Sequence, residues 1–316
     1  MIPLLICVVL LVLVLLGGVV WASSAAMPRI PPGSGIIEAI PDALETEPSP
    51  PSGQLILLAY RLGYALGPPE ARGQPLDAAT ICDRLDYVIE TIVDSGADIV
   101  FLQEADFASQ RTHDIDQLYY IAAALGWGYA ARASTWECRY LPWPLRQPTG
   151  RIRAGMGVIS RYPLVQNVRQ RLPHARPYPP LAARWLPSPM VQMVDVQCGG
   201  TTLRLLQVEG GTTGAIGSRR QLQALASFIR DVQTPASVML AAQPAPLAQL
   251  SMELDHRFRV VTDGASSAGL ARALVGVGLS PLEIRVLPVE ASVLGQAPLV
   301  LHLRWALPLI EWNGSW

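Results

Sequence analysis

One acidic residue, Glu104, stands at the end of the apolar run in "DIVFLQEAD", residues 98–106. A strand over this run would carry Glu104 to its C-terminal end, where loops hold functional groups on a rigid scaffold. A carboxylate placed there could bind a divalent cation through its oxygens. The alternative is an ordinary charged residue at a strand end, and this stretch alone does not decide between the two.

Basic residues gather in one part of the chain. From Cys138 to Val194 there are nine arginines, one histidine and no acidic residue. Such a stretch would attract phosphate, nucleic acid or anionic head groups. The alternative is that several of these arginines bind carbonyl groups or pair with acids elsewhere in the sequence. The candidates for binding an anionic ligand are Arg151, Arg153 and Arg161.

Histidines and cysteines do not form a recognisable site. The histidines are His113, His174, His256 and His302, and the cysteines are Cys7, Cys82, Cys138 and Cys198. No pattern pairs a histidine with a nucleophile or a metal, so we interpret the histidines as structural. Without a CxxC pair the cysteines indicate no zinc site, and the three in the folded part could form at most one disulfide.

The first residues of the chain are suited to a membrane. No residue is charged from Met1 to Pro28, and the apolar run over residues 2–22 is long enough to cross roughly 30 Å of hydrocarbon as a helix. We predict an uncleaved anchor within residues 1–27. A cleaved signal peptide is the alternative, because "WASSAA" offers small residues after the run. The flank that follows carries little positive charge, so we expect a single-pass protein with an extracytoplasmic domain.

Composition divides the rest of the chain. Residues 28–53 are rich in Pro, Gly and Ser and predict a linker, followed by a folded domain over residues 54–306 and a tail over 307–316. "QLILLAY" and "DIVFLQ" are typical of strands, and the segment between them predicts an amphipathic helix that ends at Gly96. Further helices are predicted over "DQLYYIAAALG" and "RRQLQALASFIRDV", and strands over "GMGVIS", "LRLLQV", "SVMLAA" and "PLVLHLRW".

In order and spacing, these segments resemble the endonuclease/exonuclease/phosphatase superfamily, the fold of DNase I, apurinic endonucleases and sphingomyelinases. "LLAYRLGYALG" resembles the opening strand, and "ADIVFLQEAD" resembles the motif whose Glu binds the metal. "YLPWPLRQPTGRIRAGMGVISRYPL" resembles the middle of the fold, and "GSRRQLQALASFI" resembles the Arg-x-x-Gln helix. The resemblance implies a four-layer α/β sandwich, with two mixed β-sheets packed face to face and helices outside.

The resemblance also implies hydrolysis of phosphoric esters with Mg²⁺, in which an Asp orients the attacking water and histidines donate to the phosphate. Of the positions that carry this chemistry, only Glu104 matches. Arg61 stands where a metal-side Asn is expected, and Val208 or Glu209 stands in place of a His. The remaining replacements are Ala242 for an Asp, Pro244 for an Asn, Gly295 for an Asp and Gln296 for a His.

These losses predict a pseudoenzyme, or a severely impaired enzyme, that is held at a membrane and acts by binding an anionic ligand or a protein partner. Nucleic acid ranks behind these ligands, and no cofactor is expected although the family uses Mg²⁺. The alternatives are an active Mg²⁺-dependent phosphodiesterase or phosphatase with a rebuilt site, and a structural ectodomain of a cell-envelope assembly. We expect the replaced positions to meet in one cleft, where Arg61 pairs with Glu104 in place of a metal. In the alternative, Arg61 turns to solvent.

Overall fold

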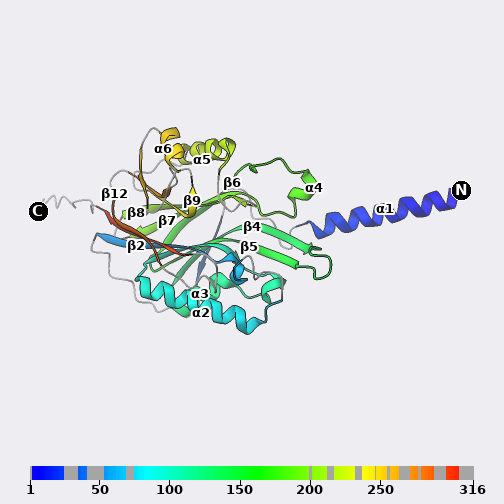
Figure 1. Cartoon of the computed structure of the whole chain (residues 1–316), viewed down its shortest axis with the longest axis horizontal. Coiled ribbons are helices and arrows are strands. Elements are labelled where there is room, and N and C mark those ends of the chain that lie inside the picture. Colours follow the sequence, from blue (N-terminus) through cyan, green and yellow to red (C-terminus); the bar gives the residue numbers. More distant parts are fainter. Residues whose placement is uncertain are drawn as a thin grey trace, which may run out of the picture.

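The computed structural model describes residues 2–24, 35–40, 53–68, 75–198, 201–211, 217–231, 237–245, 247–254, 257–262, 271–276, 279–287 and 297–305. Within these residues, two mixed β-sheets lie face to face and helices cover their outer faces (Figure 1). The four-layer α/β sandwich predicted from the sequence is therefore confirmed.

The first sheet has seven described strands, in the order β1-β4-β5-β3-β2-β13-β12. Their bounds are β1 Ile36–Ala39, β4 Tyr129–Leu141, β5 Gly150–Ser160, β3 Ile99–Asp106, β2 Gln54–Arg61, β13 Leu299–Trp305 and β12 Leu279–Val286. β2 and β3 are parallel, with Arg61 opposite Gln103, whereas the other neighbours are antiparallel. The C-terminal ends of β2 and β3 therefore reach the same edge of the sheet.

The second sheet has six described strands, in the order β10-β11-β9-β8-β7-β6. Their bounds are β10 Phe258–Val261, β11 Ala271–Gly276, β9 Ser237–Ala245, β8 Thr201–Glu209, β7 Met190–Cys198 and β6 Leu164–Arg171. β8 and β9 are its parallel pair, with Gln207 opposite Leu240. The sequence predicted β8 and β9 from short apolar runs with β-branched residues, whereas β6, β7, β10 and β11 were not predicted.

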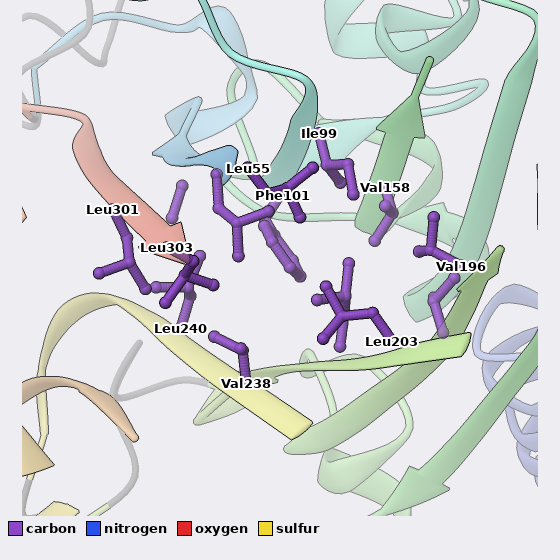
Figure 2. Close-up of a cluster of buried hydrophobic side chains, with 14 of the residues drawn as sticks. Leu55, Ile99, Phe101, Val158, Val196, Leu203, Val238, Leu240, Leu301 and Leu303 are labelled. Atoms are coloured by element: carbon purple, nitrogen blue, oxygen red, sulfur yellow. The ribbon is translucent and has the colours of Figure 1, made fainter. Parts of the chain in front are cut away.

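Apolar side chains from both sheets fill the space between them (Figure 2). Leu55, Phe101 and Val158 come from the first sheet, and Leu203 and Leu240 face them from the second. All of them are buried. Burial of apolar area stabilises the fold by about 25 cal/mol per Å², so this cluster is the main force that holds the two sheets together.

Helices close the outer faces. α2 (Ala78–Ser95) and α3 (Gln117–Leu125) pack on the first sheet, and α5 (Arg219–Asp231) and α6 (Leu247–Glu253) pack on the second. The remaining short elements are α4 (Pro180–Ala183) and the 3₁₀ turns η1 (Gly63–Ala65) and η3 (Gln110–Thr112). α2 ends at Gly96, as predicted, because this residue has a φ of 66° that favours glycine.

Helix α1 (Ile2–Ala22) has the bounds predicted for the apolar run. It projects away from the sandwich, and most of its side chains are exposed (Figure 1). Among the described residues it is the one helix long and apolar enough to cross a membrane. Its domain end, residues 22–24, contacts β4.

The expected linker over residues 28–53 contains a strand, so that prediction is wrong at residues 36–39. β1 pairs with the edge strand β4, from Ile36 opposite Arg132 to Ala39 opposite Tyr129. A strand of four residues is too short to give a clear periodic pattern, and its pairing depends on a partner far along the chain. The pairing is reinforced by Arg132, which donates to Glu38 at 2.5 Å.

Candidate functional site

The C-terminal ends of the parallel strands β2 and β3 place Arg61 and Glu104 side by side. Arg61 is the last residue of β2, and its register partner Gln103 directly precedes Glu104 on β3. Parallel strands deliver their C-terminal residues to one edge of a sheet, which is a common place for functional groups. The sequence predicted Glu104 at the end of a strand, whereas β3 continues two residues further, to Asp106.

The backbone at Glu104 has an uncommon conformation. Its φ is +52°, in the left-handed region that residues with side chains rarely adopt. At the same place the pairing of β3 with β5 shifts register between Leu102 and Ala105. A bulge of this kind turns a side chain away from the regular alternation of a strand. Strain held by a surrounding fold often marks a functional position.

Arg61 and Glu104 form an ion pair in which Arg61 Nη2 donates to Glu104 Oε1. The two side chains are 15% and 7% exposed, so the pair is largely removed from water. The second oxygen, Glu104 Oε2, is buried and has no hydrogen-bond partner among the described residues. The contact expected from the sequence is present, and its role as a substitute for a metal stays a prediction.

A second carboxylate, Glu209, reaches the same place from the other sheet. It ends β8 and is 2% exposed, with Thr135 Oγ1 of β4 donating to its two oxygens at 3.4 and 3.5 Å. Burial, together with the charge of Glu104, raises the pKa of Glu209 to about 8 against the opposing effects of Arg61 and the Thr135 hydrogen bond. Glu209 is therefore mainly protonated at neutral pH. It is a neutral acid beside the Arg61–Glu104 pair.

The sheets are joined directly at this site. Gln103 Nε2, next to Glu104, donates to the carbonyl oxygen of Val208 at 2.9 Å. Val208 and Glu209, the alternative replacements for the expected His, thus both lie at the site, but only Glu209 presents a titratable group. This crossing bond fixes the end of β8 against the end of β3.

Sequence reasoning missed a buried polar cluster beneath the site, which we call the Asp106 cluster: Tyr64, Asp106, Ser109, Arg111, Thr112 and Trp136. Asp106 is fully buried and accepts two hydrogen bonds from Arg111, both at 2.9 Å. Ser109 and Thr112 also donate to it, at 2.7 and 3.0 Å. The sequence signal was the second acid of "QEAD", whose importance depends on Arg111 five residues later.

Two aromatic rings that meet edge to face contact the cation of the Asp106 cluster. The Arg111 guanidinium lies 3.9 Å from the centroid of the Tyr64 ring and 4.9 Å from that of Trp136. Burial raises the pKa of Tyr64 well above its ordinary value, and Glu209 and Glu104 raise it further. The Tyr64 ring therefore contacts Arg111, and Tyr64 lies close enough to Glu104 and Glu209 for their negative charges to raise its pKa.

The structure describes only some of the other positions at which the expected catalytic residues are replaced. Ala242 and Pro244 lie on β9, just beyond Leu240, which pairs with Gln207 of β8. Their main chain therefore runs toward the same end of the second sheet as Glu209. Gly295 and Gln296 fall outside the described residues. Arg61, Glu104 and Glu209 thus lie together as expected, whereas the cleft and the convergence of the other positions stay a prediction.

The three arginines proposed for an anionic ligand do not form one patch. Arg151 is about half exposed and pairs with Asp114 at 2.7 Å. Arg153 follows on β5, and its N–H donates to Ser109 Oγ at 3.1 Å. Arg161 lies past the far end of β5, with its guanidinium 5.0 Å from the Trp127 ring. Ten residues of strand separate Arg151 from Arg161 by about 33 Å, so these two arginines cannot bind one small ligand together.

For the histidines within the described part of the chain, the contacts found do not involve Glu104 or Glu209. His113 Nε2 is bound to the carbonyl oxygen of Leu76 at 2.7 Å, and His174 makes an edge contact with Tyr178. His302 lies on β13 opposite Ile56, five residues before Arg61. His256 is outside the described residues. The cysteines in the described residues are all free.

The donor set does not fit a divalent cation. No group of three or more His, Cys, Asp or Glu side chains that could hold a metal occurs among the described residues. One oxygen of Glu104 already accepts from a cation, and its neighbour Glu209 favours the protonated form. A metal ion would have to share this buried space with a fixed guanidinium, which is electrostatically costly.

Residues 71–226 match the model of the "Endonuclease/Exonuclease/phosphatase family". No curated protein matches the sequence. Among solved structures, the endonuclease/exonuclease/phosphatase from Beutenbergia cavernae is 17% identical, with a TM-score of 0.54 over 80% of this chain and 72% of that chain.

Two further structures give the same picture. A family protein from Bacteroides thetaiotaomicron is 12% identical, with a TM-score of 0.52 over 80% of this chain and 98% of that chain. The human Nocturnin catalytic domain, solved with a bound sulfate anion, is 15% identical, with a TM-score of 0.51 over 86% of this chain and 97% of that chain. At such identities the likeness concerns the fold alone.

Proposed function

We propose that this chain, whose residues 71–226 match the family model, is a membrane-anchored, catalytically impaired member of the endonuclease/exonuclease/phosphatase family that acts by binding. The observation that carries the proposal is the buried Arg61–Glu104 ion pair. The family is generally dependent on a divalent metal, and here a guanidinium lies against the one carboxylate that matches the family's metal-binding Glu. The fixed cation supplies the positive charge locally, and the described residues around it offer no group of three or more acids, histidines or cysteines for a metal.

The loss of the other catalytic groups also supports impaired catalysis. Ala242 and Pro244 carry no group that could orient a water molecule, and Glu209 stands where a phosphate-binding His is expected. Catalytic groups that act as a unit lose most of their effect when one is removed, and typical losses are many orders of magnitude. A site with one matching residue supports binding far better than hydrolysis.

Anchoring by α1 is the second part of the proposal. A helix of 21 residues whose apolar side chains face outward on all sides is poorly suited to water and well suited to a lipid bilayer. We propose that the domain is held extracytoplasmically at the membrane surface. The ligand we favour carries phosphate, because the acid-free stretch from Cys138 to Val194 presents several arginines on that part of the domain.

The first test addresses metal binding and turnover. We expect the full chain in detergent to hydrolyse bis-p-nitrophenyl phosphate with Mg²⁺ no faster than the protein-free control. Calorimetric titration should detect no saturable Mg²⁺ or Mn²⁺ binding. Arg61→Asn removes the cation and should allow weak metal binding without turnover. Arg61→Lys, the matched control, keeps the charge and should bind no metal.

One result would revive the reading of this protein as an active hydrolase with a rebuilt site. That result is Mg²⁺-dependent turnover by the unaltered chain that Glu104→Ala abolishes. Metal on Glu104 with Arg61 turned away, in a crystal soaked in Mn²⁺, would count equally against the proposal.

A second test addresses the ligand. We expect the full chain to bind inositol hexakisphosphate saturably in a calorimetric titration, with an affinity that falls as salt is added. Arg151→Glu should weaken binding about fivefold, because one exposed charge contributes about 1 kcal/mol. Arg161→Glu is the control, since Arg161 lies at the remote end of β5 and should change binding little. Equal effects of the two variants would mean non-specific attraction. No binding at all would favour the structural-ectodomain alternative.

A further inference from the structure

The end of α1 is fixed to the sandwich rather than tethered loosely. The main-chain N–H of Arg139, on β4, donates to the carbonyl oxygen of Ser24 at 2.9 Å. Arg139 Nε also donates to Ser24 Oγ at 2.8 Å. Ala22 and Ser23, which end the helix, are buried against the domain. The point at which the chain leaves α1 is therefore held on the outer part of β4.

Beyond this contact, β4 and β5 continue as a hairpin whose end is apolar and exposed. We call residues 140–149 the hairpin tip. Within the tip, Trp143 is 65% exposed and Leu145 is 73% exposed, and Tyr140 is also exposed. Large apolar side chains exposed together on a protruding element commonly mark an interaction surface. In Figure 1 the hairpin points in the direction in which α1 leaves the domain, and it ends beside the domain end of that helix.

The backbone of the hairpin tip is constrained. Thr149 Oγ1 donates to the carbonyl oxygen of Trp143 at 2.6 Å, and the N–H of Gln147 donates to that of Pro144 at 2.9 Å. Prolines at positions 142, 144 and 148 further restrict its conformations. The exposed side chains are therefore presented by an ordered loop, which reduces the entropy lost when they are buried in another phase.

The composition of the hairpin tip suits the boundary between lipid and water. Tryptophan and tyrosine prefer that boundary, because each has an apolar ring and a polar group. Arg139 and Arg146 flank the apolar residues, and no acidic residue lies between Cys138 and Val194. Long arginine side chains can reach phosphate head groups while their stems stay in apolar surroundings.

We propose that the hairpin tip inserts into the head-group region of the bilayer that α1 crosses, as a second membrane contact beside the helix. This inference rests on the proposed function in one respect, namely that α1 is a membrane anchor. The occupant of the apolar surface is lipid rather than a protein, because Ser24 and Arg139 hold the hairpin at the level where α1 leaves the bilayer. Two fixed contacts would set the orientation of the domain as well as its distance.

That orientation turns the candidate site toward the membrane. Thr135, which donates to Glu209, precedes Arg139 by four residues on β4. Four residues of strand span about 13 Å. The Arg61–Glu104–Glu209 site therefore lies on the membrane-proximal side of the sandwich, where a phosphate-bearing group at the bilayer surface is within reach.

The test uses the full chain in nanodiscs of phosphatidylcholine, with and without phosphatidylcholine brominated on its acyl chains. Bromine quenches tryptophan emission only at close contact. Trp143→Phe should remove about half of the quenched emission, because Trp21 at the end of α1 and Trp143 are the residues expected at the lipid boundary. Trp21→Phe should remove most of the remainder. Trp127→Phe is the control, since Trp127 is buried near Arg161 at the remote end of the sheet.

A second variant guards against loss of folding. Leu145→Glu keeps Trp143 as the reporter but places a charge in the hairpin tip, and we expect its Trp143 emission to shift to longer wavelength and lose quenching. Far-ultraviolet circular dichroism, which reports the folded backbone, should be unchanged for each variant.

The outcomes separate the two proposals. Quenching that drops with Trp21→Phe but not with Trp143→Phe would overturn the hairpin proposal and leave the anchor intact. Quenching that responds to neither variant would contradict the anchor as well. A Trp143 that stays open to aqueous acrylamide in the nanodisc would also overturn insertion, and would direct attention to a protein partner for the tip.

Discussion

Asp106→Ala should lower the free energy of unfolding of the full chain by about 3–5 kcal/mol, the usual cost of breaking a buried ion pair. Asp106 is fully buried and accepts from Arg111, Ser109 and Thr112. Removing its carboxylate leaves the Arg111 guanidinium, which contacts the Tyr64 and Trp136 rings, without a counter-ion. A buried charge in that state is costly, because neither ring replaces the lost hydrogen bonds. Urea denaturation in detergent, followed by tryptophan emission, measures the change.

The chain offers a matched control for this prediction. Asp114 pairs with Arg151 at 2.7 Å, but both side chains are about half exposed. Asp114→Ala should therefore change the free energy of unfolding by less than about 1 kcal/mol, as exposed pairs usually do. In the double variant Asp106→Leu with Arg111→Met, both charges are gone, and part of the lost stability should return. Similar losses in the Asp106 and Asp114 single variants would contradict this account of the Asp106 cluster.

The stability of the protein should fall as the pH rises from about 4.5 to about 8, and Glu209 should cause much of the fall. Burial, with the charge of Glu104, raises the pKa of Glu209 from 4.5 to about 8. In this range the folded state holds a proton that the unfolded state has released. The stabilisation is therefore complete below the lower pKa and is lost as the pH passes the upper one. The expected loss is on the order of 2–4 kcal/mol.

Glu209→Gln isolates this effect. Glutamine has nearly the same shape and does not titrate, so the variant should lose less stability between about pH 5 and about pH 8 than the unaltered chain. Other acids whose pKa burial raises, such as Asp98, remain in both proteins and cancel in the comparison. Glu90→Gln, on the exposed side of α2, should keep the original pH profile. If the stability of Glu209→Gln changes with pH in parallel with that of the unaltered chain, Glu209 is not the group that holds the extra proton in the folded state.

The protonation of Glu209 also bears on the proposed function. With a neutral Glu209, the charges of Arg61 and Glu104 cancel and the site carries little net charge. Above about pH 8 an extra negative charge would appear beside the pair. A phosphate-bearing ligand should then bind less well, because like charges repel at short range. The calorimetric titration proposed above, repeated on both sides of this pH, would detect the change.

Much of the fold could be predicted from the sequence, because its causes are local. An uncharged apolar run predicts α1 from Ile2 to Ala22, and the structure has those bounds. Helical spacing of apolar residues and the glycine at position 96 predict α2 and its end. Short apolar and β-branched runs predict β2, β3, β5, β8, β9 and β13, since such runs and their turn residues are visible within a few positions. The order of these elements resembles the family strongly enough to predict the sandwich.

Local patterns missed features that depend on distant residues. Strand β1 exists because β4 lies beside it, although the surrounding residues are rich in proline. The importance of Asp106 depends on Arg111 and on two aromatic rings, which come together only when β2, β3 and β4 are assembled. The left-handed backbone at Glu104 is likewise maintained by its pairing with β5.

By itself, then, the sequence determined the apolar helix, the layers of the sandwich and the replacement of family residues at the strand ends. It also placed Arg61 and Glu104 on neighbouring motifs, from which their pairing could be expected. Only the tertiary structure decided between Val208 and Glu209, because Glu209 reaches the site from the second sheet and its pKa depends on burial there. It alone decided that Ser24 is fixed to Arg139, since no sequence pattern records a contact between residues 115 positions apart.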